Sequence, residues 1–283
     1  MTIHESVSAE VERDLKTYFS ATPLLTVPTE DGLWTIRRRE TSGSARPLLA
    51  LPGIQGGSGI FCSLFARCDT QVELICADAP LLSEVDTMIR STAQLLDQLD
   101  IGRIDLLGCS LGGYLAQAFA MAHPERVDRL VLSNSFYDAS TYLQTLPSID
   151  AIAASDAAVL LNKARISALS APGIDAGSIR LQVVMATLLG PHQTAVQFKA
   201  RMELLARTYP LPRTPLPDER VLLIDDSHDP VLPRPMRQAI RARYAASEHH
   251  AIPRGGHLPV VQQPDTFARL LFRWLRNTPF TTH

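Results

Sequence analysis

Residues 104–122 constrain this chain more than any other stretch of its sequence. An apolar run at 104–107 leads into Gly108-Cys109-Ser110-Leu111-Gly112, and a helix-forming run at 114–122 follows. A strand, a G-x-S-x-G sequence and a helix in that order are typical of a turn so tight that its flanks must lack side chains. Such a turn would hold the Ser110 hydroxyl clear of a sheet, with the backbone N–H of Leu111 directed at a developing oxyanion. The pattern predicts that Ser110 is a nucleophile.

The most glycine-dense part of the chain, residues 52–59, directly follows a short apolar run at 47–51. The alternatives are a flexible loop and a loop that supplies a second oxyanion donor. Its position after an early buried strand favours the second interpretation, with the backbone N–H of Ile54 or Gln55 as the donor. The stretch lacks the G-x-x-x-x-G-K-[ST] sequence and is therefore not a phosphate-binding loop.

Short apolar runs and amphipathic segments alternate along the first half of the chain. A leading helix at 7–19 and a loop rich in Thr and Pro come first. A later helix is expected to have Ser83 as its cap and its apolar face on residues between 85 and 99. The Arg37-Arg38-Arg39 sequence is expected on a solvated edge strand. Strands are expected at 33–39, 47–51, 72–77, 104–107 and 127–132. This rhythm predicts right-handed βαβ units, a mostly parallel sheet and the α/β fold class.

The rhythm stops at Asn134. No strand is predicted from there to about Tyr209, but helices are expected at 149–166, 178–189 and 195–207, and four prolines between 210 and 217 form a stiff return. The alternation then resumes with strands at 221–224 and 249–252 and helices at 235–245 and 265–276. We therefore expect a core of residues 1–133 and 216–283, with residues 134–215 forming a helical lid over the carboxyl ends of the strands, where ligands bind in such sheets. The apolar residues of this insertion either form a pocket for an acyl group or pack it onto the sheet.

A serine nucleophile needs a base and a group that orients the base. His257 is the candidate base because it alone among the eight histidines combines small preceding residues, a predicted strand upstream and a closing helix behind. Asp229, on the loop after the penultimate strand, is the candidate acid. Asp225, Asp226 and Asp138 are its competitors.

Composition excludes several other classes of protein. A net charge of −2 gives no field that would attract nucleic acid or an anionic membrane, and no apolar run could span a bilayer. The acidic first 25 residues do not resemble a secretory signal. The four cysteines show neither C-x-x-C nor a metal-ligand spacing. They are expected to be reduced, buried thiols of a cytoplasmic protein, with a Cys62–Cys68 bridge as the alternative.

The order Ser110, Asp229, His257 resembles that of the α/β-hydrolase superfamily, from the Pro52-Gly53 loop to the His257 loop. More narrowly, residues 108–117 (GCSLGGYLAQ) and 133–136 (SNSF) resemble the maspardin family. That resemblance implies the same hydrolase sheet. It also implies a rival function, because maspardins are held to act as binding proteins and lack the usual histidine. The presence of His257 departs from that pattern and favours catalysis.

The sequence thus predicts hydrolysis of a carboxylic ester or thioester, a small-molecule substrate, through an acyl-enzyme on Ser110. No metal or organic cofactor is implied, and Ser110 excludes the related reactions that use a carboxylate nucleophile. Acyl transfer to an acceptor other than water and a catalytically weak, maspardin-like interaction module are the alternatives. For its assembly, the alternatives are a homo-oligomer and a complex with a protein partner.

Overall fold

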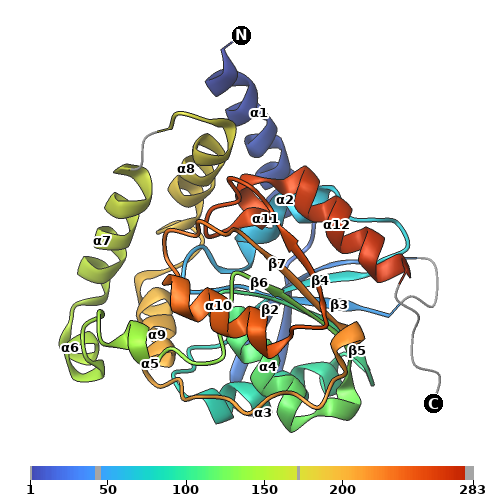
Figure 1. The fold of residues 1–283 in the computed structure, drawn as a ribbon. Coiled ribbons are helices and arrows are strands. Elements are labelled where there is room, and N and C mark those ends of the chain that lie inside the picture. Colours follow the sequence, from blue (N-terminus) through green and yellow to red (C-terminus); the bar gives the residue numbers. More distant parts are fainter. Residues whose placement is uncertain (1, 42–45, 171–172, 278–283) are drawn as a thin grey trace.

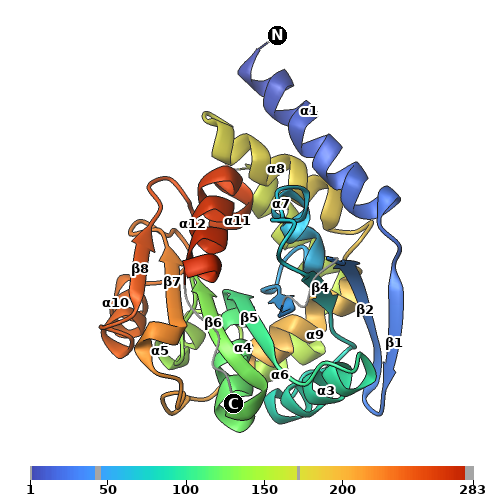
Figure 2. The same ribbon diagram turned by 90° about the vertical axis from the view of Figure 1, so that its right-hand side faces the viewer.

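A computed structural model describes residues 2–41, 46–170 and 173–277. An eight-stranded sheet forms the centre of the protein. The strand order is β1-β2-β4-β3-β5-β6-β7-β8, and Figure 2 shows it running from β8 at the left to β1 at the right. The strands from β3 to β8 pair in parallel, while β1 and β2 are antiparallel. The predicted α/β class is confirmed. The strands are β1 (Leu25–Thr29), β2 (Gly32–Arg39), β3 (Leu48–Leu51), β4 (Leu74–Asp78), β5 (Ile104–Cys109), β6 (Val127–Ser133), β7 (Val221–Asp225) and β8 (Glu248–Ala251).

Helices cover both faces of the sheet, so every residue of β3, β5, β6 and β7 is buried. This explains why those strands are mostly apolar instead of alternating. The buried Asp105 of β5 and Arg129 of β6 are exceptions, and they are hydrogen-bonded to each other. Figure 1 shows α3 and α4 below the sheet and α2, α11 and α12 above it. The first face also carries α10, whose Met236 and Ile240 join its apolar core. The bounds are α2 (Cys62–Ala66), α3 (Val85–Gln98), α4 (Leu111–Ala122), α10 (Arg234–Arg243), α11 (Pro259–Gln262) and α12 (Pro264–Asn277).

The N-terminal segment differs from its prediction at one strand. Helix α1 (Ile3–Lys16) continues into a π-helix (Thr17–Ala21), and the stretch expected to be a loop then forms the edge strand β1. The sequence did not predict β1 because it contains Pro28. Proline is excluded from central strands but is tolerated in an edge strand. The expected edge position of Arg37 is therefore wrong. Arg37 is only 9 % exposed, donates from Nε to the carbonyl of Tyr18 at 2.7 Å, and lies over the Tyr18 and Phe19 rings.

The expected cap of α3 is also wrong. The helix begins at Val85, one residue later than a Ser83 cap requires, and Glu84 at the N-cap accepts no side-chain hydrogen bond. Asp86 in the first turn still favours this end of the helix through its charge. The expected apolar face is confirmed, with Met88, Ile89, Leu95 and Leu96 buried against the sheet.

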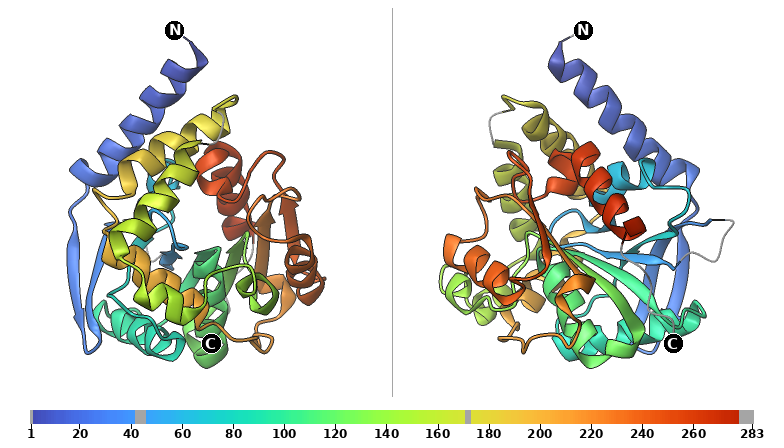
Figure 3. Two further views of the ribbon diagram at one scale, coloured as in Figure 1. Left: turned by 90° about the vertical axis from the view of Figure 1, so that its left-hand side faces the viewer. Right: turned by 45° about the vertical axis from the view of Figure 1, so that its right-hand side comes forward.

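Between β6 and β7 the described chain forms helices and a single isolated bridge, Leu189 with Gln193. The helix expected at 149–166 is two helices, because the chain turns at Ser155-Asp156. Figures 1 and 3 show this insertion on one side of the sheet and next to α1, to which Arg180 of α8 is joined by an ion pair with Glu10 at 2.6 Å. Its helices are α5 (Ser140–Leu143), α6 (Ile149–Ala154), α7 (Ala157–Ser170), α8 (Ala176–Leu188) and α9 (Ala195–Ala206). Elsewhere in the chain, short 3₁₀ helices lie at Gly57–Phe61, Pro124–Arg126 and Asp218–Arg220.

Candidate active site

Ser110 lies at the sharp turn between β5 and α4. Its backbone has φ 53° and ψ −121°, a conformation that costs energy for a residue with a side chain. The neighbouring glycines are required by space: a Cβ on Gly108 would overlap the Gly112 carbonyl, and a Cβ on Gly112 would overlap that of Leu51. The Ser110 N–H donates to the carbonyl of Ser133, and the Ser135 hydroxyl donates to the carbonyl of Ser110, both at 2.9 Å. These two bonds from the end of β6 hold the turn in place.

The structure brings Ser110, His257 and Asp229 together in one hydrogen-bonded row. The Ser110 Oγ lies 3.0 Å from His257 Nε2, and His257 Nδ1 lies 2.9 Å from Oδ2 and 3.1 Å from Oδ1 of Asp229. The Asp229 side chain is fully buried, whereas the His257 side chain is 18 % exposed. A buried carboxylate on one imidazole nitrogen fixes which nitrogen carries the proton, and leaves the other nitrogen free to accept the hydroxyl proton.

The three competing aspartates have other partners. Asp225 binds Arg241 with both oxygens at 2.7 Å, and His249 at 2.9 Å. Asp226 accepts from the backbone N–H groups of Gly256 and His228, both at 2.8 Å. Asp138 accepts from Ser140. Asp229 alone among them contacts His257, and the N–H groups of Val231 and Leu232 hold its carboxylate at 2.7 and 3.2 Å.

Asn134 is a site residue that the sequence reasoning missed. It directly follows β6 with φ 38°, and its Nδ2 donates to the carbonyls of Gly256 and His257 at 2.6 and 2.9 Å. Its Oδ1 accepts from the N–H of Asp226 at 3.0 Å. Asn134 therefore joins the loop that carries the histidine to the loop that carries the acid. An amide side chain at the end of a buried strand was the available signal.

The residues whose N–H groups are expected to stabilise an oxyanion lie near Ser110 on two elements. Leu111 begins α4, and the Gly53 backbone passes so close to Ser110 that a Cβ there would lie 3.1 Å from the serine Cβ. Ile54 and Gln55 line the same cavity as Ser110. Within the parts of the chain that the structure describes, no group accepts a hydrogen bond from the N–H of Ile54, Gln55 or Leu111.

A cavity of about 220 Å³ opens beside Ser110 and His257. Its other side comes from the insertion, through Tyr142, Leu146, Phe198, Met202 and Leu205. No Asp, Glu, Lys or Arg side chain of the described residues lines it. Burial raises the pKa of Tyr142, and the nearby Asp229 charge raises it further, so the phenol stays neutral. The cavity suits an uncharged, apolar group.

The four cysteines are free and buried. Burial raises the pKa of the Cys109 thiol, next to Ser110, to about 12, so this thiol stays protonated and unreactive at neutral pH. No cluster of three or more His, Cys, Asp or Glu side chains able to hold a metal occurs within residues 2–41, 46–170 and 173–277. In the same residues no helix is both long and apolar enough to cross a membrane.

A strained serine between β5 and α4, facing a histidine and an aspartate from loops after later strands, defines the arrangement of an α/β-hydrolase. Residues 48–270 match the alpha/beta hydrolase family, and the chain belongs to that family. The resemblance to maspardin is also confirmed: maspardin of Danio rerio is 30 % identical over 141 residues, which are 48 % of this chain and 45 % of that protein. The chain thus aligns with about half the length of the curated relatives it matches.

Two further proteins extend the comparison. A poly(3-hydroxyalkanoate) depolymerase of Ectopseudomonas oleovorans is 34 % identical over 96 residues, covering 31 % of this chain and 34 % of the depolymerase. A thermophilic esterase from Thermogutta terrifontis superposes with a TM-score of 0.69 over 90 % of this chain and 99 % of the esterase, at 18 % identity. At that identity the superposition shows the fold alone.

Proposed function

We propose that this chain is a serine hydrolase that cleaves a carboxylic ester or thioester through an acyl-enzyme on Ser110. The observation that carries the proposal is the hydrogen-bonded row of Ser110, His257 and Asp229. The Ser110 Oγ lies 3.0 Å from His257 Nε2, and His257 Nδ1 lies 2.9 Å from Asp229 Oδ2. A hydroxyl is a weak nucleophile until a base removes its proton, and this geometry supplies the base and its orienting acid.

The residues take complementary roles in two half-reactions. In the first, Ser110 Oγ attacks the acyl carbon while His257 Nε2 takes its proton, and the N–H groups of Leu111 and of Ile54 or Gln55 stabilise the oxyanion. The tetrahedral intermediate then expels an alcohol or thiol, which leaves with the proton from His257. In the second, a water molecule attacks the acyl carbon while His257 Nε2 takes its proton. The bond between the acyl carbon and Ser110 Oγ then breaks, the carboxylic acid leaves, and His257 returns the proton to Ser110 Oγ. Asp229 stays ionised throughout and stabilises the imidazolium.

We further propose that residues 134–215 act as a lid over a core formed by residues 1–133 and 216–283. The lid side of the cavity, with Phe198, Met202 and Leu205, would receive the acyl chain. The similarity to a poly(3-hydroxyalkanoate) depolymerase and to an esterase supports an ester substrate. The same residues could pass the acyl group to an acceptor other than water, since only the second nucleophile differs.

The similarity to maspardin supports the rival proposal of an interaction module with weak catalysis. The two functions differ in what Ser110 must do. A hydrolase depends on its hydroxyl, whereas a module that binds a protein partner does not.

Replacing Ser110 by alanine tests the proposal. The variant should lose hydrolysis of p-nitrophenyl butyrate and of a butyryl thioester, because no acyl-enzyme can form. A residual rate about 10³-fold above water could survive from the oxyanion donors. Circular dichroism and the melting temperature should remain those of the wild type, since the smaller side chain fits the same turn. A folded Ser110→Ala variant that turns over at the wild-type rate would overturn the assignment.

A further inference from the structure

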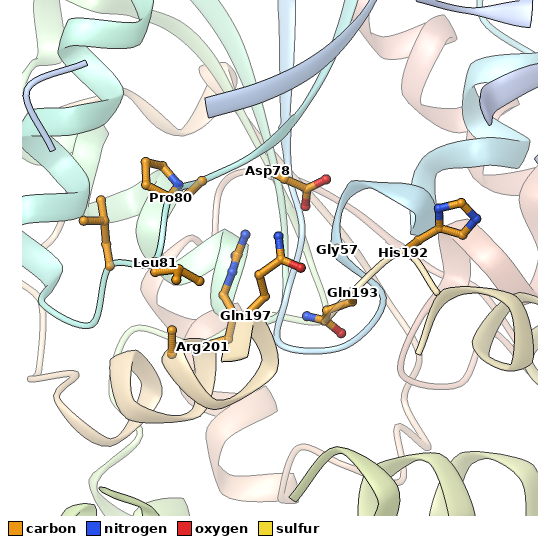
Figure 4. Close-up of a pocket in the computed structure, with 11 residues that line it drawn as sticks. Gly57, Asp78, Pro80, Leu81, His192, Gln193, Gln197 and Arg201 are labelled. Atoms are coloured by element: carbon orange, nitrogen blue, oxygen red, sulfur yellow. The ribbon is translucent and has the colours of Figure 1, made fainter. Parts of the chain in front are cut away.

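The loop of residues 52–57, which carries Ile54 and Gln55, faces Ser110 on one side and the insertion on the other. On the insertion side is a small cavity of about 10 Å³, whose lining includes the polar residues Asp78, Gln193, Gln197 and Arg201. Figure 4 shows Gln197 and Arg201 extending from α9 in the direction of Asp78, with Gln193 beside the loop that carries Gly57. Gln193 is only 3 % exposed and Arg201 only 8 %. These buried polar side chains take no part in the mechanism described above.

Gln193 binds the backbone of this loop with both ends of its amide. Its Nε2 donates to the carbonyl of Ile54 at 2.6 Å, and its Oε1 accepts from the N–H of Gly56 at 2.8 Å. The pair resembles the two bonds that one strand makes with another, but a side chain from the α8–α9 connection provides them. Buried amides that satisfy both donor and acceptor in this way hold their partner in one orientation.

The orientation of the Ile54 carbonyl determines that of the Gln55 N–H. The structure contains no cis peptide bond in the residues it describes, and the two polar groups of a trans peptide point to opposite sides. Because the Ile54 carbonyl points towards Gln193, the Gln55 N–H points away from Gln193. Gln55 also lines the cavity that contains Ser110.

Arg201 acts in the same way on the preceding peptide. Its Nη1 lies 3.3 Å from the carbonyl of Pro52 and 3.4 Å from that of Gly53, within long hydrogen-bond distance. With the Gly53 carbonyl on the Arg201 side, the Ile54 N–H is directed away from the insertion. Burial lowers the pKa of Arg201 and the nearby Asp78 charge opposes that shift.

We infer that Gln193 and Arg201 are positioning residues: the insertion sets the direction of the Ile54 and Gln55 N–H groups and thereby completes the oxyanion site. The inference rests on the proposed hydrolase function. It assigns the insertion a part in transition-state stabilisation in addition to substrate binding. A peptide unit released from Gln193 could turn its carbonyl towards the oxyanion position, which would repel the charge that it should stabilise.

Gln193→Glu is the sharpest test, because it replaces the donating end of the amide by an oxygen that faces the Ile54 carbonyl. We expect kcat for ester hydrolysis to fall about 10²-fold, the size of effect seen when one oxyanion donor is lost, with KM changed less than about threefold. Gln193→Leu, which removes both bonds without adding charge, should lower kcat in the same direction. Melting temperatures identify any variant that fails to fold.

Gln197→Glu is the matched control. Gln197 lines the same cavity, but its Oε1 accepts from the N–H of Thr194 and makes no bond to the loop; a carboxylate preserves that bond. Its kcat should stay within about twofold of the wild type. Folded Gln193 variants with wild-type kcat, or a Gln197→Glu variant impaired as much as Gln193→Glu, would overturn this inference alone. A wild-type chain that hydrolyses no ester would overturn the proposed function, and the role of Gln193 with it.

Discussion

Three aspartates lie close together in the sequence, Asp225 at the end of β7 and Asp226 and Asp229 in the loop after it, and each has different neighbours. Asp225 holds Arg241 and His249, Asp226 holds two backbone N–H groups, and Asp229 faces His257. The three carboxylates thus have different roles: Asp225 joins neighbouring elements, Asp226 holds the shape of a loop, and Asp229 orients an imidazole. Spacing alone could not separate these tasks, because each depends on what a distant segment brings to the carboxylate.

Neutralising these carboxylates one at a time should separate the three tasks. Asp229→Asn should lower kcat by about 10⁴, because an amide at this position favours the wrong imidazole tautomer. Asp226→Asn and Asp225→Asn keep the Asp229–His257 contact and should lower kcat far less. The measurement is kcat for one ester in all three variants, with melting temperatures as the control for folding. A larger loss in Asp226→Asn than in Asp229→Asn would contradict the assignment of the acid.

At the scale of elements, Asp225 links three of them. From the end of β7 it binds His249 of β8 and Arg241 of α10. Burial raises the pKa of Asp225, but the hydrogen bonds from His249 and Arg241 outweigh it, so the net shift is below the ordinary value. The last strand and the helix beside it are therefore attached to the sheet by an ionised carboxylate.

This link makes a prediction about acid stability. A carboxyl whose pKa is lowered by folding stabilises the protein fully above its unfolded pKa, about 3.9, and loses that contribution as pH falls through the lower folded value. Asp225→Asn should therefore reduce the free energy of unfolding by about 1–2 kcal/mol at pH 7, a modest figure because Arg241 is 30 % exposed. The difference should shrink below about pH 4. Urea unfolding at pH 7, 5 and 3 measures it; a difference that grows on acidification would contradict the assignment.

Local sequence predicts the elements well where local physics decides them. Buried parallel strands such as β3 and β7 read as apolar runs, and the glycines around Ser110 indicate the turn. The prediction fails where a distant contact decides. Strand β1 depends on pairing with β2, and the contacts of Asn134 with His257 and of Gln193 with Ile54 join segments 123 and 139 residues apart.

At the scale of the whole molecule, the cavity beside Ser110 has one wall from the sheet loops and one from the insertion. A pocket of about 220 Å³ that no Asp, Glu, Lys or Arg of the described residues lines should prefer longer acyl chains. Each methylene buried contributes about 0.8 kcal/mol, or about fourfold in kcat/KM, until the pocket is full. A series of p-nitrophenyl esters from acetyl to dodecanoyl should therefore rise and level off. A preference for acetyl over every longer chain would refute an acyl pocket.

A bulkier residue in this wall should shorten the preferred chain. Met202→Trp would fill part of the cavity and move the optimum to shorter esters, with little effect on acetyl ester hydrolysis. Val196→Trp is the matched control, because Val196 lies on the same helix α9 and is 55 % exposed. An unchanged chain-length profile in Met202→Trp would place the acyl chain elsewhere.

The central claim, that Ser110 is activated by His257, is tested most directly by labelling with a fluorophosphonate probe. The wild type should be labelled at Ser110, because His257 Nε2 lies 3.0 Å from the Ser110 Oγ and can take the hydroxyl proton. His257→Asn, which removes the base, should remain folded and lose labelling. A small and a long probe should be used together, so that a closed insertion does not hide a competent serine. If neither probe labels the wild type above His257→Asn, the triad does not operate, and the interaction-module function replaces the hydrolase.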